Sequence, residues 1–184
     1  RVLIIARDPY NWIASSLEIG GDCAKLIEPF TNEMNFHGTR LEIYLKQLRC
    51  VMGEENPTGL DIYPINFNKW FESQVYRQEI ARELNFEFSD QGLHQVSEFG
   101  GGSSFDSDKG ARNGQTMGVL ERWQKYRQDS RFLEIVNRKE VVSVAEGFFG
   151  YSLDFAESGV DERKSLSGKV RKLARYFKSP HTQQ

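Results

Sequence analysis

The chain has 184 residues, of which 39% are hydrophobic and 27% are charged, and 24 Lys and Arg against 26 Asp and Glu give a formal net charge of -2. This length suits one ordinary domain, and the composition is that of a folded protein rather than a disordered one. The balanced charge argues against a nucleic-acid partner, and no apolar run approaches the ~20 residues that cross a bilayer. We therefore expect a cytoplasmic protein with no transmembrane segment. Cys23 and Cys50 lie too far apart for a cysteine-built metal site, and we expect no metal.

The chain begins with a short apolar run, VLIIA, at residues 2–6. Its β-branched residues predict a strand buried on both faces, as in a parallel sheet. Pro9 predicts a turn after this strand, and Asn11 is a good N-cap for a helix over residues 12–18. Strand, turn and helix together form half of a βαβ unit.

The next elements are predicted from hydrophobic spacing. An apolar stripe predicts a helix over residues 39–52, and LDIYPI predicts a second strand over residues 60–65, at an end or edge position because of Pro64. A helix follows over residues 70–85. Two short strands cannot form an independently stable sheet, so we expect further strands upstream of Arg1 and expect this chain to be a fragment of an α/β domain.

The second half of the chain is less regular. The glycine-rich stretch over residues 99–118 predicts a binding loop or a flexible loop. Helices are expected over residues 119–126 and 132–148, the second with Phe132, Ile135, Val136 and Val142 on one face. The region from 152 to 184 forms a basic amphipathic tail, which could dock on its own domain or contact acidic lipid or a polyanionic acceptor.

Arg7 and Ser15 are the residues that point to a ligand site. Arg7 follows the first strand, and ligands of open α/β sheets bind at the carboxyl ends of strands. Ser15 lies eight residues later, so its hydroxyl can face back toward the strand end. A guanidinium and a hydroxyl beside a helix N-terminus can form a phosphate site. The alternative is that Arg7 pairs with Asp8 or a helix terminus and that Ser15 is merely small.

Arg7-Asp8-Pro9, followed by five residues and Ser15, resembles the 3′-phosphate-binding motif of sulfotransferases. The resemblance continues in residues 60–90, in Ser103-Ser104-Phe105, in Trp123 and in the Gly150-Tyr151 ending, and covers residues 1–151. It implies that these residues are the C-terminal part of a sulfotransferase-like domain. The implied fold is a P-loop-like three-layer fold with a parallel sheet, here rich in helices and without its N-terminal strands and phosphosulfate loop.

The resemblance also implies a chemistry and a set of site residues. The co-substrate would be 3′-phosphoadenylyl sulfate, whose sulfuryl group moves to a hydroxyl or amine of a small-molecule or carbohydrate acceptor. Arg7 and Ser15 would hold the 3′-phosphate, and Ser103 and Phe105 would line the nucleotide site. A basic loop over the same phosphate would contain Arg112 or Lys109, although both could instead be solvated charges in a loop.

The chain also departs from the family. No GxxxxGK[ST] sequence is present, and Asn66-Phe67-Asn68 replaces the usual Tyr-Glu-Asp. The family's catalytic Glu or His would lie upstream of Arg1, so no catalytic residue is named and the 184 residues alone are expected to have no turnover. Two alternatives are a kinase-like nucleotide-binding protein of related fold and a non-catalytic binding domain.

Overall fold

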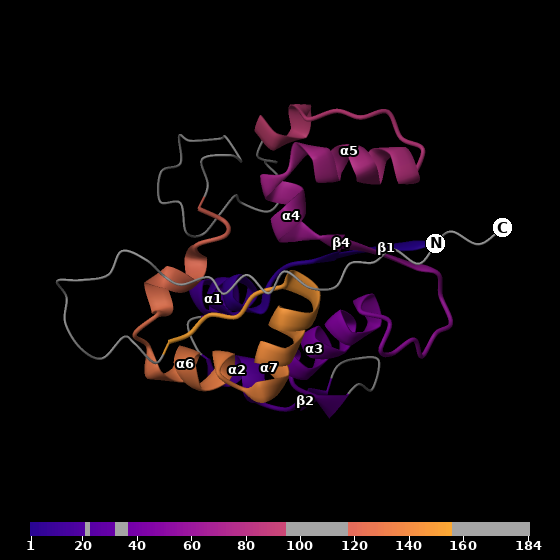
Figure 1. The fold of residues 1–184 in the computed structure, drawn as a ribbon. Helices are drawn as coiled ribbons and strands as arrows, with labels where there is room; N and C mark the ends of the chain where they lie inside the picture. Colours follow the sequence, from indigo (N-terminus) through magenta and orange to yellow (C-terminus); the bar gives the residue numbers. More distant parts are fainter. Residues whose placement is uncertain (21–22, 32–36, 95–117, 156–184) are drawn as a thin grey trace.

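The computed structural model describes residues 1–20, 23–31, 37–94 and 118–155. Within these residues, β1 (Val2–Ala6) and β4 (Ile62–Asn66) pair in parallel, with Val2 opposite Ile62 and Ala6 opposite Asn66. β2 (Phe30–Thr31) and β3 (His37–Gly38) form a separate antiparallel pair. In Figure 1, β1 and β4 lie between α4 and α5 on one side and the other labelled helices on the other side.

Helices make up most of the described residues. They are, in chain order, α1 (Pro9–Gly20), α2 (Ala24–Ile27), α3 (Arg40–Val51), α4 (Phe67–Glu72), α5 (Gln74–Glu83), the 3₁₀ turns η1 (Gln91–His94) and η3 (Arg122–Tyr126), α6 (Ser130–Val136), α7 (Lys139–Val144) and the π-helical turn η4 (Ala145–Phe149). The described part is therefore a mixed α/β structure, dominated by helices, with a small parallel sheet. Both predicted strands and the predicted helix near residues 39–52 are confirmed.

The start of α1 differs from the prediction. Pro9 is its first residue, and the Asp8 carboxylate accepts a hydrogen bond from the Asn11 amide at 2.9 Å, which is the contact of an N-cap. Proline suits the first helical position because its missing N–H would have no partner there. Asp8, and not Asn11, therefore caps the helix.

Two predicted helices are each divided in the structure. The helix expected over residues 70–85 is broken at Ser73, whose extended backbone ends α4 and whose hydroxyl accepts from the Tyr76 amide at 3.2 Å. The helix expected over residues 132–148 is broken after Val136, where Asn137 ends α6 and Arg138, with an extended backbone and no side-chain cap, precedes α7. Because α7 starts afresh after this break, a different side of it faces the core. Val141 is 0% exposed and occupies the buried place that the sequence pattern indicated for Val142.

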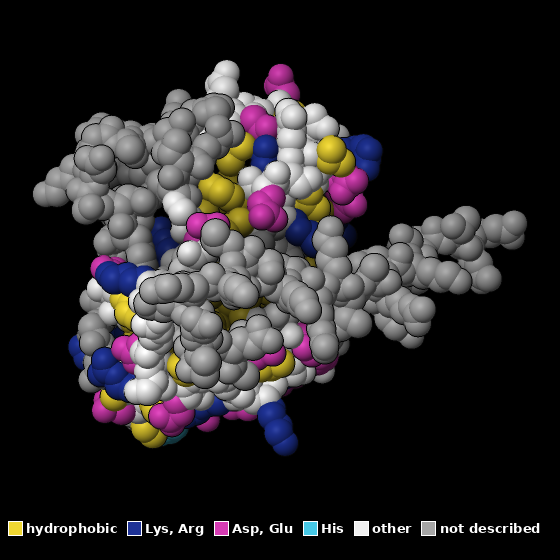
Figure 2. Space-filling view, turned by 60° about the vertical axis from the view of Figure 1, so that its left-hand side comes forward, with side chains coloured by type: hydrophobic (Ala, Val, Ile, Leu, Met, Phe, Trp, Pro, Cys, Tyr) yellow, Lys and Arg dark blue, Asp and Glu magenta, His cyan; other side chains and the backbone are white. Residues whose placement is uncertain are grey.

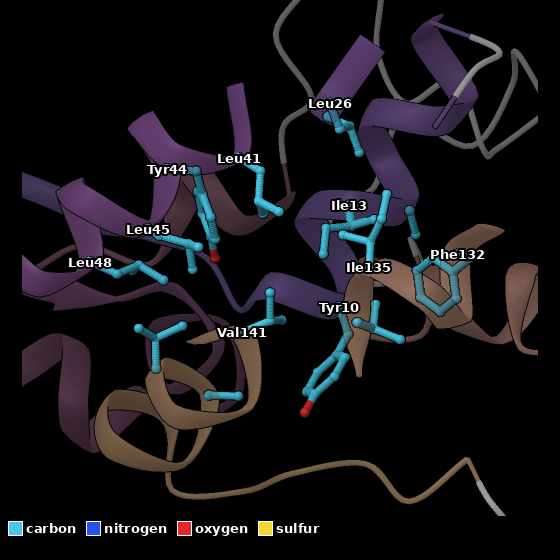
Figure 3. Close-up of a cluster of buried hydrophobic side chains, with 14 of the residues drawn as sticks. Tyr10, Ile13, Leu26, Leu41, Tyr44, Leu45, Leu48, Phe132, Ile135 and Val141 are labelled. Carbon is cyan, nitrogen blue, oxygen red and sulfur yellow. The ribbon is translucent and has the colours of Figure 1, made fainter. Parts of the chain in front are cut away.

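The hydrophobic core is formed by helices on one side of the strand pair. Figure 3 shows Tyr10 and Ile13 of α1 near Ile135 and Phe132 of α6, with the side chains of α3 beside them. Tyr10, Ile13 and Phe132 are each 0% exposed. The core extends to Phe155, which is 9% exposed and lies edge-on to the Phe132 ring.

The prediction that β1 is buried on both faces is wrong for the described residues. Val2 is 39% exposed, Leu3 46% and Ile5 66%, and only Ala6 at the carboxyl end is buried. The physical reason is that β4 is the strand paired with β1 in the described part of the chain and helices cover only part of the pair. The expectation of further strands in this sheet stays a prediction.

None of the helices in the described ranges is long and apolar enough to cross a membrane. Four predicted site residues, Ser103, Phe105, Lys109 and Arg112, lie outside these ranges, and so does the predicted tail from residue 156 onward.

We predict that Leu48→Ala destabilises the protein far more than Ile5→Ala. Leu48 is 1% exposed in the core, whereas Ile5 is 66% exposed on β1. Removing a buried leucine side chain costs about 2–5 kcal/mol, while an exposed substitution stays within about 0.5 kcal/mol. Urea unfolding of both variants measures the difference. A loss of several kcal/mol with Ile5→Ala would show that β1 is covered in solution.

Candidate anion-binding site

The Arg7 side chain lies at the carboxyl end of β1, where it contacts three other parts of the chain. Its Nη1 donates to the Ser15 hydroxyl of α1 at 3.0 Å, and its Nη2 donates to the Val119 carbonyl. Its Cζ lies 5.7 Å from the centroid of the Phe67 ring at the start of α4. The guanidinium therefore joins the strand end to α1, α4 and the segment before η3.

The Arg7 guanidinium forms no ion pair within the described part of the chain, and the carboxylate of the neighbouring Asp8 accepts from Asn11 instead. Burial, followed by the positive charge of Arg122, lowers the pKa of Arg7 to about 10, so the side chain is still a cation at neutral pH. Its buried Nε has no acceptor in the described structure. A buried cationic donor without an acceptor is suited to an anionic ligand.

Ser15 is held in a complete set of hydrogen bonds. Its hydroxyl donates to the Asn11 carbonyl at 2.8 Å and accepts from Arg7 at 3.0 Å. It also accepts from Nη1 of Arg122 at 3.0 Å. A hydroxyl has one hydrogen and two lone pairs, so all three are used here. The sequence indicated Ser15 as a donor to a ligand, whereas in this structure it orients two guanidinium groups.

Arg122 is the site residue that the sequence analysis missed. It is the first residue of η3, and 107 positions separate it from Ser15. No motif marks it, because the contact depends on how η3 packs along α1. The two Nη1 atoms of Arg7 and Arg122 contact the same oxygen, so they lie within about 6 Å of each other.

The buried side chains of Asp8 and Asn11 fasten η3 to α1. Both are 0% exposed, and the Asp8 carboxylate accepts from the backbone and side-chain nitrogens of Asn11, each at 2.9 Å. The Asn11 side chain then donates to the Leu120 carbonyl at 2.8 Å and accepts from the Trp123 amide at 3.4 Å. Arg122 lies between these two attachment points, which fix its backbone beside Ser15.

The backbone of Arg7 is held from the opposite side by α3. The Tyr44 hydroxyl donates to the Arg7 carbonyl, and the Tyr44 ring stacks on Trp12 with centroids 4.0 Å apart. Burial raises the pKa of Tyr44 well above its ordinary value, so the phenol keeps the proton that this bond needs. Arg7 is thus positioned through both its side chain and its main chain.

The neighbouring strand brings amide and aromatic groups to the same edge. Asn66, the last residue of β4, lies opposite Ala6 and caps α4 by accepting from the Lys69 amide at 3.1 Å. Phe67 follows it, directly beside Arg7. Asn68 donates to the Tyr151 hydroxyl at 3.4 Å. Burial and the charge of Asp8 raise the pKa of Tyr151, which therefore stays neutral.

The positive charge at the candidate site is local to Arg7 and its neighbours. Elsewhere on the face shown in Figure 2, positive and negative side chains are interspersed, in keeping with the net charge of -2. In the described parts of the chain, no group of three or more His, Cys, Asp and Glu side chains could hold a metal ion. The ligand that these residues suit is an anion that can accept several hydrogen bonds.

A hollow further along α1 is lined by Leu17, Glu18, Tyr126 and Asp129, among others. Its acidic groups already have structural roles. Glu18 accepts from Lys125 and from the Tyr126 hydroxyl, and Asp129 caps α6 by accepting from the Arg131 and Phe132 amides. This hollow therefore does not compete with the Arg7 region as a candidate site.

Comparison of the chain with protein-family models, with curated proteins and with solved structures gave no match. The structure brings Arg7 and Ser15 together, as the sequence predicted, and adds Arg122. The roles expected for Ser103, Phe105, Lys109 and Arg112 concern residues outside the described ranges and stay predictions.

We predict that Glu18→Gln destabilises the protein more at pH 7 than at pH 3. Hydrogen bonds from Lys125 and then Tyr126 lower the pKa of Glu18 in the folded state. A carboxyl group with a lowered pKa adds stability above its unfolded pKa of about 4.3, and this stability is lost as pH falls through the folded value. Chemical unfolding of both proteins between pH 3 and 7 measures the change. A difference that is independent of pH would contradict this role of the carboxylate.

Proposed function

We propose that the chain carries the 3′-phosphate-binding half of the donor site of a sulfotransferase with a P-loop-like three-layer fold. The donor is 3′-phosphoadenylyl sulfate, and the acceptor is a hydroxyl or amine of a small molecule or carbohydrate. The observation that carries the proposal is the 3.0 Å contact between Arg7 and Ser15 at the carboxyl edge of a parallel strand. The spacing of Arg7 and Ser15 in the sequence predicted that these two side chains meet, and their contact supports the proposal.

The charge around Arg7 supports a phosphate as the group bound there. Arg7 is a cation with no carboxylate partner in the described structure and with a buried Nε that lacks an acceptor. A planar guanidinium binds phosphate oxygens through parallel hydrogen bonds, which gives orientation as well as energy. Had Arg7 been paired with Asp8, the alternative raised by the sequence, this support would be missing.

The proposed role of these residues is to position the donor. In the transfer, the acceptor oxygen or nitrogen bonds to sulfur while the bond from sulfur to the bridging phosphate oxygen breaks, releasing adenosine 3′,5′-bisphosphate. Arg7 acts on a phosphate remote from the breaking bond, and Ser15 orients the Arg7 guanidinium. Binding energy at a remote group fixes the register of the substrate and can be used to lower the barrier at the reacting atoms.

We predict that Arg7→Ala in the full-length protein weakens binding of adenosine 3′,5′-bisphosphate more than tenfold. Hydrogen bonds to a charged group contribute about 1.5–3 kcal/mol each, and the variant loses more than one of them. Calorimetry measures the affinity. Arg82→Ala is the matched control, since Arg82 is an exposed arginine of α5 and its replacement removes the same charge.

Adenosine 5′-phosphate, which lacks the 3′-phosphate, separates this site from general nucleotide affinity. The wild-type protein should bind it more weakly than the bisphosphate, and Arg7→Ala should not weaken it further. Equal affinity of the wild-type protein for the two nucleotides would overturn the proposed function, and tighter binding of ATP than of the bisphosphate would favour the kinase-like alternative.

A further inference from the structure

The Arg7 guanidinium lies over the ring of Phe67 in this structure. The Arg7 Cζ is 5.7 Å from the centroid of the ring, within the ~6 Å range of a cation–π contact. The pairing of β1 with β4 explains this contact, because Ala6 lies opposite Asn66 and the residues that follow them are Arg7 and Phe67. The two side chains therefore meet at the carboxyl end of the strand pair.

The backbone before Phe67 is fixed by other parts of the chain. The side chain of Asn66, which is 4% exposed, accepts from the Lys69 amide at 3.1 Å and donates to the Phe148 carbonyl at 3.4 Å. The backbone amide of Asn66 also donates to the Tyr76 hydroxyl at 3.2 Å. These contacts set the point at which α4 begins, and with it the place of the Phe67 ring.

The Phe67 ring is also supported within α4. It stacks on the rings of Trp70 and Phe71, with centroids 6.1 Å away in both cases and interplanar angles of 24° and 28°. A ring that is packed against two others has few rotamers left to lose. It therefore presents a fixed surface to Arg7.

An aromatic ring stabilises a cation in a different way from a carboxylate. A carboxylate accepts hydrogen bonds from a guanidinium and cancels its charge, whereas the negative face of a ring attracts the cation and carries no net charge. Two of the guanidinium nitrogens of Arg7 donate to Ser15 and to the Val119 carbonyl. The nearby charge of Asp8 also favours the Arg7 cation. With Phe67 beside it, the guanidinium is held in place and can still bind an anion.

We propose that Phe67 is a positioning residue of the candidate site, whose ring holds the Arg7 guanidinium in the orientation that binds the phosphate. This inference rests on the proposed function and deepens it, because it names what keeps the anion-binding cation in place. Phe67 acts through Arg7 and not on the ligand itself. Its effect should therefore be confined to ligands that carry the phosphate bound by Arg7.

The first test compares Phe67→Leu with wild type in the full-length protein by calorimetry, with adenosine 3′,5′-bisphosphate and adenosine 5′-phosphate as probes. Leucine keeps the side chain apolar and removes the ring face. We expect a loss of affinity of about three- to tenfold for the bisphosphate and no change for the monophosphate. Phe86→Leu is the matched control, because Phe86 is 64% exposed. Equal losses for the two nucleotides would contradict a role that is exerted through Arg7.

A fluorination series separates the cation–π contact from packing. Phenylalanine with one, two or three ring fluorines has nearly the same size, while each fluorine withdraws electron density from the ring face that attracts the cation. Incorporated at position 67, these residues should lower the affinity for the bisphosphate step by step. Affinity that stays constant along the series would overturn the proposed role. The same series replaces Phe67→Leu if that variant does not fold.

A double-mutant cycle tests whether Phe67 acts through Arg7. In the Arg7→Ala protein, Phe67→Leu should cause no further loss of affinity for the bisphosphate, because the cation that the ring holds is absent. A loss of the same size with and without Arg7 would show that Phe67 acts on the ligand or on the fold instead. Thermal unfolding reports whether each variant is folded.

The outcomes separate this inference from the proposed function. If the wild-type protein binds the bisphosphate no more tightly than adenosine 5′-phosphate, the proposed function fails and the role of Phe67 fails with it. If the wild-type protein prefers the bisphosphate and both Phe67→Leu and the fluorinated proteins keep its full affinity, the role of Phe67 is wrong and the proposed function stands.

Discussion

The site depends on the buried contact between Asp8 and Asn11. The Asp8 carboxylate caps α1 and accepts a hydrogen bond from the Asn11 side chain. The Asn11 side chain also forms hydrogen bonds with the backbone of Leu120 and Trp123. Buried polar groups of this kind are costly unless their hydrogen bonds are made. Here the Asn11 side chain makes two of them with residues that are 109 or more positions away in the sequence. The same contact therefore caps a helix, closes the fold and brings Arg122 to Ser15.

The strand pair supplies the edge on which this arrangement lies, and its packing is uneven. Ala6 and Ile65, near the carboxyl ends of β1 and β4, are buried, whereas Val2, Leu3 and Ile5 are exposed. Two strands do not make an independently stable sheet, and in the described residues the end near Arg7 is held by α1 and α3. The best-supported end of the sheet is thus the end that carries the candidate site.

Much of this could be predicted from local sequence. VLIIA is a continuous apolar run that indicates a strand, and the stripe of α3 has a helical period. The spacing of Arg7 and Ser15 places them together because a strand end and the second turn of the next helix are close in any βα unit. The helix breaks at Ser73 and Arg138 were not predicted, since neither residue is Pro or Gly, although each has an extended backbone in the structure. Val141 took the buried place expected for Val142 for that reason.

Arg122 could not have been predicted from spacing, because its contact with Ser15 spans 107 positions and depends on the docking of η3 on α1. Phe67 is a similar case, since its ring reaches Arg7 only because β4 pairs with β1. Local motifs thus indicated the first half of the site, while tertiary packing supplied the second.

The most direct measurement is a crystal structure of the full-length protein with adenosine 3′,5′-bisphosphate. We expect oxygens of the 3′-phosphate to lie within about 3.2 Å of guanidinium nitrogens of Arg7. A nucleotide bound with its 3′-phosphate elsewhere, while Arg7 still donates to Ser15, would contradict the proposed site.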